Sequence, residues 1–260
     1  MPRETRQPDE TTPEHLPGGS GGVWKVGRTV RRPTGPWTPA VHELLGWLAD
    51  EGLGGVPHVG GIDEDGREIV SYIEGRGVPA DEIVLDTVLV DAVAWLREYH
   101  DLAESYRPDG PRVWRQTGDD PVALEPGQIV CHNDPGVYNW IIQSGRFVAM
   151  IDWDLAGPGE PIDDLAFLCW TAIPLSRDIG SVEAARRLDL VADTYAEWGP
   201  MTLLDAVERR MTTATERIAA GIERGDPGML HLATRGEPQR TRARLADFRA
   251  RRRSVEASLS

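Results

Sequence analysis

The segment from Cys131 to Asp154 constrains this chain more than any other part of it. Two apolar runs, WII and FVAMI, flank a Ser-Gly pair, and this pattern predicts a β-hairpin. Three polar residues, Asp134, Asn139 and Asp152, stand just outside the two runs. Because the outer ends of two hairpin strands lie side by side, we expect these three side chains to converge.

Asp134, Asn139 and Asp152 are, in chain order, the kinds of group that phosphoryl transfer to a hydroxyl requires. One carboxylate orients the acceptor hydroxyl and accepts its proton, while an amide oxygen and a second carboxylate hold Mg²⁺ on the nucleotide phosphates. The spacing His-x-Asp-x-x-x-x-Asn, which begins here at His132, is that of a protein-kinase catalytic loop. We therefore expect Asp134 to be the catalytic base and Asn139 and Asp152 to be the metal ligands. The alternative is a plain β-hairpin with acidic residues on a solvated loop.

The strings HNDPGVYNW and IDWD, taken together, resemble the aminoglycoside phosphotransferase family, the small-molecule branch of the kinase-like fold. In that family Ile-Asp-Trp stands where protein kinases carry Asp-Phe-Gly. The resemblance implies a bilobal α+β fold with a small β-rich N-lobe and a larger, mainly helical C-lobe. It places a disordered lead at 1–13, the N-lobe that clamps the nucleotide at 14–73, and the C-lobe with the catalytic loop, metal site and acceptor pocket at 74–260.

The resemblance also assigns two supporting residues to the catalytic loop. His132 is counted with Asp134 as a catalytic residue, and it is expected to brace the loop through hydrogen bonds instead of transferring protons. Asp164, in an Asp-Leu-Ala triplet, is expected to accept backbone hydrogen bonds from the loop and so hold it in place. N-capping of the next helix by Asp163 or Asp164 is the alternative. Asp154 is interpreted as a solvated loop residue, with a second neighbour of the metal site as the alternative.

Two stretches of the predicted N-lobe are candidates for nucleotide binding. Gly19-Ser20-Gly21 lies in a glycine-rich turn, where backbone amides can approach phosphates without a side chain between them. The second stretch comprises Ser71, Tyr72 and Ile73. In a kinase-like fold this stretch would be the hinge that meets the adenine edge. A simple flexible turn and an ordinary edge strand are the respective alternatives.

The third strand of the N-lobe lacks the lysine that contacts phosphate in relatives. Lys25 is the only lysine of the chain, and it lies on the second predicted strand. By resemblance Arg31 or Arg32 takes the place of that lysine, and we favour Arg31. An arginine can hold phosphate oxygens in a fork, but with stricter geometry than lysine. The nearest candidate for the partner glutamate on the following helix is Glu43, but a solvated glutamate is the favoured interpretation.

Apolar periodicity predicts the remaining elements. A helix with Thr38 as N-cap and Pro39 at its first position is expected to end at Gly52. Two strands within 57–73 are expected to turn at Asp65-Gly66. Further helices are predicted at 81–106, from 163, at 181–198, from 202, near 227–233 and at 238–256.

Charge and composition narrow the class of partner. The formal net charge of −14 argues against nucleic acid, whose binding surfaces are basic. Residues 235–253 hold eight Arg against two acids, so the remainder carries about −20 and is compatible with a cationic substrate. The two cysteines lack metal-ligand spacing, which predicts buried free thiols. Without a signal peptide or an apolar run of spanning length, we expect a cytoplasmic protein with no membrane contact.

These features predict a Mg²⁺-dependent phosphotransferase that moves the γ-phosphoryl group of ATP or GTP to a hydroxyl of a small molecule. A cationic, aminoglycoside-like antibiotic or related natural product is the favoured acceptor, which would make the protein a resistance enzyme, and a monomer or weak dimer is expected. A metabolic kinase for an amino alcohol or sugar and a nucleotide-binding pseudokinase are the alternatives. Intact Asp134, Asn139 and Asp152 argue against a pseudokinase. The carboxylates that could bind a cationic acceptor are Glu183, Asp193, Glu197 and Glu216.

Overall fold

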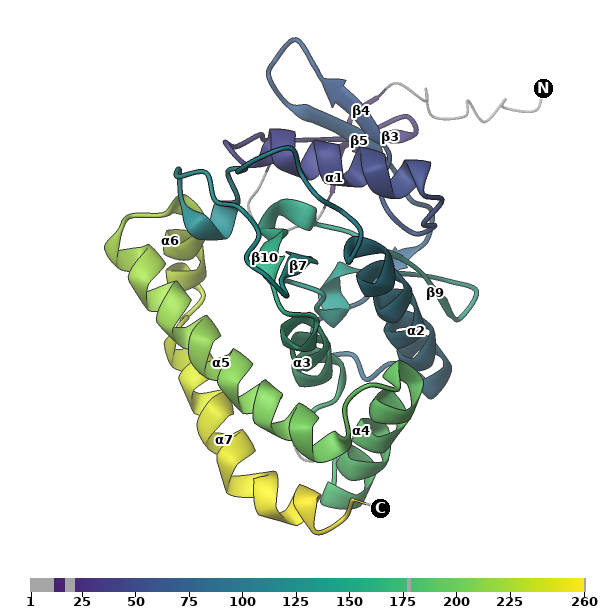
Figure 1. Ribbon diagram of the computed structural model, residues 1–260, viewed down its shortest axis with the longest axis vertical. Coiled ribbons are helices and arrows are strands. Elements are labelled where there is room, and N and C mark those ends of the chain that lie inside the picture. The colour runs from purple at the N-terminus through teal and green to yellow at the C-terminus, as the bar shows by residue number, and fades with distance from the viewer. Residues whose placement is uncertain (1–11, 17–21, 177–178, 260) are drawn as a thin grey trace, which may run out of the picture.

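The computed structural model describes residues 12–16, 22–176 and 179–259, and these form a small β-sheet region joined to a larger helical region (Figure 1). The first sheet is antiparallel, in the order β1-β2-β3-β5-β4. Its strands are β1 (Glu14–His15), β2 (Trp24–Val26), β3 (Thr29–Arg32), β4 (Val59–Ile62) and β5 (Glu68–Ser71). The predicted α+β class is confirmed, whereas the lobe boundaries stay a prediction.

Helix α1 (Thr38–Asp50) contacts both β4 and the 3₁₀ turn at Trp153–Leu155, so it lies between the sheet and the helical region (Figure 1). Four of its apolar residues recur on one face and are buried: Val41, Leu44, Leu45 and Leu48. The predicted N-cap is wrong by one residue, because Trp37 precedes the helix and Thr38 already belongs to it. The Thr38 hydroxyl instead accepts a hydrogen bond from the backbone N–H of Gly35 at 2.9 Å.

The predicted hairpin consists of β8 (Trp140–Gln143) and β9 (Arg146–Met150). Ser144 and Gly145 both have positive φ, 52° and 74°, as the twist of a tight hairpin turn requires. A third strand, β6 (Arg76–Gly77), pairs with β8. Beside this sheet, β7 (Ile129–Cys131) pairs with β10 (Gly157–Gly159), and these two strands flank the segment that holds the predicted catalytic residues.

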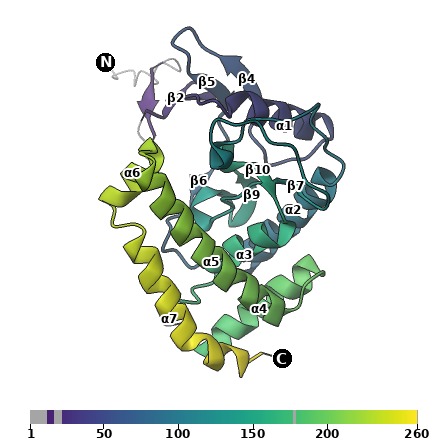
Figure 2. The same cartoon turned by 60° about the vertical axis from the view of Figure 1, so that its left-hand side comes forward.

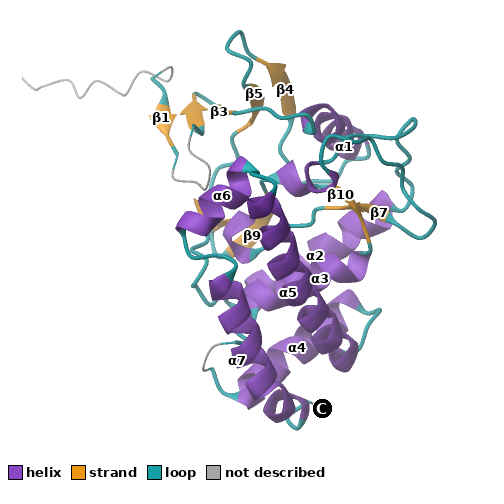
Figure 3. Cartoon of the chain, turned by 90° about the vertical axis from the view of Figure 1, so that its left-hand side faces the viewer, coloured by secondary structure: helices purple, strands orange, loops and turns teal. Residues whose placement is uncertain are grey.

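The helical region is built around α3 (Pro161–Ala172), which packs against α5 (Pro200–Glu223) (Figures 1 and 2). On the outer side of α5 lie α6 (Pro227–Thr234) and α7 (Gln239–Glu256), as Figure 3 also shows. The other helices, α2 (Asp86–Ala103) and α4 (Ser181–Tyr195), pack on each other. Each predicted helix is present, and α2 and α4 are shorter than expected because their predicted ends lie in turns.

The hydrophobic core runs without interruption from α1 through the hairpin to α7. The Arg-rich last helix joins it through Leu245 and Phe248, both buried, while Arg249 and Arg252 form ion pairs with Glu208 of α5. Both cysteines are buried free thiols, as predicted. Among the described residues, no helix combines the length and the apolar character that a membrane span would need.

Replacing Leu89 with alanine tests the core of the helical region. Leu89 is fully buried, whereas the nearby Leu85 is 67% exposed. Leu89→Ala should lower the free energy of unfolding by about 2–5 kcal/mol, because it leaves a cavity, and Leu85→Ala should change it by less than about 0.5 kcal/mol. Urea unfolding followed by tryptophan fluorescence measures both. Equal effects of the two variants would contradict this packing.

Candidate active site

The carboxylate of Asp134 lies at the centre of the candidate site and is half-buried. Its Oδ1 accepts a hydrogen bond from the Tyr138 hydroxyl at 2.5 Å, and its Oδ2 accepts one from Asn139 Nδ2 at 3.0 Å. Burial raises the pKa of Asp134 to about 7; the Tyr138 hydrogen bond opposes this rise and the negative charge of Asp152 adds to it. A carboxyl group with a pKa near neutrality is well matched to general-base chemistry.

Asn139 and Asp152 offer oxygen atoms of the kind that a divalent cation needs. Asn139 is buried and its Nδ2 donates to the backbone oxygen and the carboxylate of Asp134, which leaves its Oδ1 as the atom for a cation. The Asp152 side chain is 51% exposed, and its Oδ1 bonds to Arg32 while its Oδ2 remains. Carboxylate and amide oxygens are ligands that Mg²⁺ prefers, so this donor set fits Mg²⁺.

Two residues of the site, Asn133 and Asp152, have left-handed backbone conformations, with φ of 63° and 64°. Asn and Asp tolerate this region better than most residues, but it still costs energy outside glycine. At Asn133 the surroundings fix the conformation. Its side-chain Nδ2 donates to the Gly157 oxygen at 3.0 Å, and its carbonyl oxygen accepts from Arg210 Nη2 at 2.7 Å. The loop is therefore held in one conformation by contacts on opposite sides.

His132 is fully buried and contacts the backbone on both sides of the site. Its Nδ1 accepts the backbone N–H of Asp134 at 3.3 Å, so its Nε2 carries the proton that it donates to the Ile151 oxygen at 3.2 Å. Burial lowers the pKa of His132, which favours this neutral form. Its ring also packs on Trp153, at 4.5 Å between centroids. His132 thus ties the segment of Asp134 to the segment that leads into Asp152, and it contacts the Asp134 backbone instead of its carboxylate.

Asp164 lies beneath the loop, at the start of α3. Its two oxygens accept the backbone N–H groups of His132 and Asn133, each at 2.7 Å. It makes no N-cap hydrogen bond, because the residue before the helix is Glu160. The hydrogen bonds that the sequence predicted for Asp164 are therefore present, while their effect on catalysis stays a prediction.

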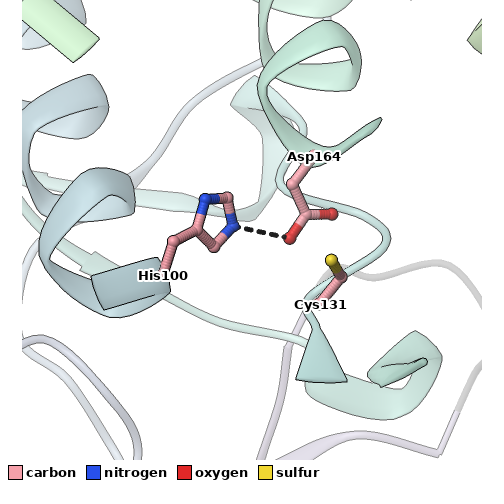
Figure 4. A group of neighbouring side chains, drawn as sticks. All are labelled: His100, Cys131 and Asp164. Carbon is pink, nitrogen blue, oxygen red and sulfur yellow. Dashed lines mark hydrogen bonds and ion pairs between the residues drawn. The ribbon is translucent and has the colours of Figure 1, made fainter. Parts of the chain in front are cut away.

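His100, Cys131 and Asp164 form a buried cluster whose potential ligand atoms lie within 4.8 Å of one another (Figure 4). The ligand atoms of His100 and Asp164 already bond to other groups of the protein. His100 contacts Asp164 through Nε2 at 3.2 Å and the Tyr195 hydroxyl through Nδ1 at 2.7 Å. Burial raises the pKa of the Cys131 thiol, and the charge of Asp164 raises it further, so the thiol stays protonated. The cluster supports the loop and does not have the chemistry of a metal centre.

The two strand arginines, between which the sequence favoured Arg31, make different contacts in the structure. Arg31 donates to the Thr29 hydroxyl at 2.7 Å and lies 3.6 Å from an Asp63 oxygen, within the sheet. Arg32 instead reaches Asp152, with Nη1 3.0 Å from Oδ1. Since neighbouring residues of a strand point to opposite faces, only one of the two can face the site, and it is Arg32.

Glu43 is not the partner of the strand arginine, because it pairs with Arg112 at 2.7 Å. The partner of Arg32 is Glu68 of β5, at 2.5 Å. Asp154 is not solvated either. Its side chain is 19% exposed and pairs with Arg32 at 2.9 Å and with Arg115 at 3.1 Å.

The predicted nucleotide-binding residues of the sheet region differ in whether their backbone N–H groups are already hydrogen-bonded and in whether the structure describes them. The backbone N–H of Ser71 donates a hydrogen bond to the His58 carbonyl oxygen at 2.8 Å, and that of Tyr72 donates one to the Arg28 carbonyl oxygen at 2.9 Å. The Nζ of Lys25 lies 3.7 Å from the centre of the Tyr72 ring. Ile73 follows in the half-buried segment between β5 and β6. Gly19, Ser20 and Gly21 lie outside the described residues.

Two of the acids proposed for a cationic acceptor are engaged elsewhere. Glu183 pairs with Arg186 and Arg187 on α4, and Glu197 pairs with Arg97 of α2. Sequence reasoning missed Arg210, a buried residue of α5 that binds the catalytic loop and packs on the Phe167 ring. Its position on the apolar side of an amphipathic helix was the signal that could have identified it.

Asp164→Asn should destabilise the protein by about 3 kcal/mol, because an amide N–H₂ would then face a backbone N–H in a buried site. The pKa of Asp164 is lowered: burial alone would raise it, but His100, His132 and the loop N–H groups outweigh burial. Its ionised form therefore stabilises the fold above its ordinary pKa, and this contribution is lost as the pH falls through the folded-state pKa. The stability gap between wild type and variant should shrink as solutions become acidic.

The neighbouring Asp163 provides a matched control. It lies on the same helix turn, and its side chain makes no hydrogen bond within the described part of the chain. Asp163→Asn should change the free energy of unfolding by less than about 0.5 kcal/mol. Urea unfolding at several pH values measures both variants, and a pH-independent gap for Asp164→Asn would count against this assignment.

Comparison with known proteins gives the family. Residues 112–204 match the profile of the phosphotransferase enzyme family (APH). The trifolitoxin immunity protein of Rhizobium leguminosarum bv. trifolii is 34% identical over 191 residues, which make up 68% of this chain and 71% of that relative.

Solved structures are similar in fold at low sequence identity. The GDP complex of aminoglycoside 2'-phosphotransferase-IIIa has a TM-score of 0.63 at 14% identity and covers 96% of each chain. A choline/ethanolamine kinase family protein from Mesorhizobium loti has a TM-score of 0.56 at 17% identity and covers 92% of each chain. These similarities show the kinase-like fold. The chain belongs to the phosphotransferase enzyme family, and it is a phosphotransferase.

Proposed function

We propose that this protein transfers the γ-phosphoryl group of ATP or GTP to a hydroxyl of a small-molecule antibiotic or toxin, with Mg²⁺ as the cofactor. The observation that carries the proposal is the arrangement of Asp134, Asn139 and Asp152. Asn139 bonds to the carboxylate of Asp134, and Asp134 lies within the electrostatic influence of Asp152. A base and two oxygen ligands thus line one site, as phosphoryl transfer needs.

In the proposed reaction Asp134 orients the acceptor hydroxyl and receives its proton. The acceptor oxygen forms a bond to the γ-phosphorus while the bond from that phosphorus to the bridging oxygen breaks, and the nucleoside diphosphate leaves. Because the transition state of such transfers is loose, positioning and charge neutralisation contribute more than proton removal. The hydrogen bonds of Asp134 to Tyr138 and Asn139 supply that positioning.

Asn139 and Asp152 would hold the Mg²⁺ ion. When bound, the ion neutralises charge on the nucleotide phosphates. Arg32 takes the part of the strand lysine, since its guanidinium lies beside Asp152. His132 and Asp164 keep the loop in the conformation that presents Asp134 and Asn139.

The nucleotide is assigned to the boundary between a lobe at 14–73 and a lobe at 74–260. At the hinge, Ile73 is the residue that we assign to the purine, because Ser71 and Tyr72 already use their backbone N–H groups within the sheet region. ATP, GTP and Mg²⁺ are cytoplasmic solutes, so we place the enzyme in the cytoplasm. We assign it as a monomer or weak dimer.

The relative named for immunity to trifolitoxin supports a role in resistance to a toxic compound. Asp163 and Glu160, at the start of α3, are the acids closest in sequence to the loop contact of Asp164, and they are available to a cationic group of the acceptor. Burial raises the pKa of Asp163 and the charge of Glu160 adds to this rise, so a cationic group bound beside Asp163 would stabilise its ionised form. They replace Glu183 and Glu197 as the proposed cation-binding carboxylates.

A panel of hydroxyl compounds tests the proposal. Aminoglycosides, other natural-product antibiotics, amino alcohols and sugars are incubated with ATP or GTP and Mg²⁺, and mass spectrometry detects the gain of one phosphate. Asp134→Asn should lower kcat by about 10²–10⁴-fold, because the transition state loses its base. Asp152→Asn should lower it at least as much. Wild-type rates in both variants would disprove the assignment, and phosphorylation of amino alcohols or sugars alone would make the enzyme a metabolic kinase.

Metal removal gives a second test, with binding as its readout. Wild-type protein should bind a non-hydrolysable nucleoside triphosphate more tightly with Mg²⁺ than with a chelator, because Asn139 and Asp152 would hold the ion and it would neutralise phosphate charge. Asp152→Asn should lose most of this difference, whereas Asp101→Asn, on the exposed side of α2, should keep it. Isothermal titration calorimetry measures the affinities. Equal Mg²⁺ dependence in wild type and Asp152→Asn would contradict the ligand assignment.

A further inference from the structure

The guanidinium of Arg32 contacts three carboxylates, each through a different nitrogen. Nε lies 2.5 Å from Glu68 Oε1, Nη2 lies 2.9 Å from Asp154 Oδ1, and Nη1 lies 3.0 Å from Asp152 Oδ1. Of the three contacts, the one from Nη1 to Asp152 is also a hydrogen bond, and those to Glu68 and Asp154 are ion pairs, in which Nε itself has no hydrogen-bond partner among the described residues. Because the guanidinium is rigid and planar, carboxylates on three of its sides restrict its orientation as well as its location.

The three carboxylates differ in exposure. We call the two less exposed ones, Glu68 and Asp154, the anchors of Arg32, and the third, Asp152, is open to solvent. The side chains of Glu68 and Asp154 are 2% and 19% exposed, whereas that of Asp152 is 51% exposed. Burial alone would lower the pKa of Arg32, but the charges of Asp154, Asp152 and Glu68 raise it by more than burial lowers it. The side chain therefore stays charged. Nη1 is therefore the nitrogen that the arrangement directs toward the accessible metal ligand.

Both anchors are themselves held from other elements. Arg32 and Glu68 are cross-strand partners in the β3–β5 register, and Glu68 Oε2 contacts His42 Nε2 of α1 at 2.9 Å. Asp154 Oδ2 contacts Arg115 Nη1 at 3.1 Å, and the Arg115 guanidinium stacks on the Trp37 ring at 4.6 Å. Each anchor thus has one oxygen on Arg32 and the other on a separate support.

We propose that Glu68 and Asp154 are positioning residues that hold Arg32 with Nη1 directed at the phosphates of the nucleotide, and that His42 fixes Glu68 for this purpose. The inference rests on the proposed function. In kinases a glutamate of the first helix pairs with the strand lysine, and here Glu68 of β5, supported by His42 of α1, would do the same for Arg32. In this chain Glu43 of α1 is unavailable for that part, since it pairs with Arg112. A lysine at position 32 could not reproduce the arrangement, because its ammonium is a single point charge on a flexible stem.

The sign of the effect separates positioning from simple electrostatics. Glu68→Gln removes a negative charge close to the phosphate site, so the change in charge alone would tighten the binding of an anionic nucleotide. Loss of orientation at Arg32 would weaken it. We expect Glu68→Gln and Asp154→Asn each to weaken binding of a non-hydrolysable nucleoside triphosphate with Mg²⁺ by about tenfold, as for other supporting residues of a binding site.

The matched nucleoside, which lacks phosphates, shows whether the effect acts through Arg32. Its affinity should be unchanged in Glu68→Gln and Asp154→Asn, whereas a general disturbance of the cleft would weaken nucleoside and triphosphate alike. Arg32→Ala and Arg32→Lys should weaken triphosphate binding, and adding Glu68→Gln to Arg32→Ala should weaken it no further. Glu43→Gln is the control, because it removes a charge from the exposed pair with Arg112. It should bind both ligands as wild type does.

Calorimetry at fixed Mg²⁺ measures these affinities, with thermal unfolding to confirm that each variant is folded. Triphosphate binding at or above wild-type strength in both Glu68→Gln and Asp154→Asn would overturn the proposal, as would equal losses for triphosphate and nucleoside. Unchanged binding by Arg32→Ala would overturn it as well. Because binding is the readout, the result is independent of the turnover assay with Asp134→Asn. Failure of wild type to bind either ATP or GTP analogue would reject both proposals.

Discussion

The catalytic loop depends on one buried carboxylate. Asp164 accepts two consecutive backbone N–H groups, and this double contact fixes Asn133 in the left-handed conformation from which Asp134 projects. The carboxylate is available because α3 runs beneath the loop, and α3 is held in turn by α5. From α5 the Arg210 side chain binds the carbonyl oxygen of Asn133. The proposed base, Asp134, is thus oriented by the helical region itself.

The sheet region contacts this site through the guanidinium group of one residue, Arg32. Arg32 joins β3 to β5 through Glu68 and to the segment after β9 through Asp152 and Asp154. Without Arg32 of the sheet region, Asp152 and Asp154 would each lose an ion-pair partner, so the two regions are coupled electrostatically as well as by packing at α1. Lysine in this place would satisfy fewer of those carboxylates, which accounts physically for an arginine at this position.

The features that the sequence predicted depend on residues close together in the chain, whereas those that it missed depend on residues far apart in the chain. Asp134, Asn139 and the hairpin are specified by residues close together, so spacing and turn chemistry were enough to place them. The choice between Arg31 and Arg32 depended on which face of β3 turns toward the site, and that face is set by pairing with β5. The partners of Glu43 and Asp154 lie far away in the chain, on Arg112 and on Arg32 and Arg115. Such contacts leave no local pattern, because they form only once the regions have packed.

The solitary lysine has a practical consequence. Lys25 lies over the ring of Tyr72, beside the segment proposed as the hinge, and its side chain is 26% exposed. With no other lysine in the chain, it is the single side-chain amine that an amine-selective reagent can modify. A fluorophore or an isotopic methyl label attached there would occupy one defined position. Its signal would report on that one surface of the sheet region, without mutagenesis to remove other lysines.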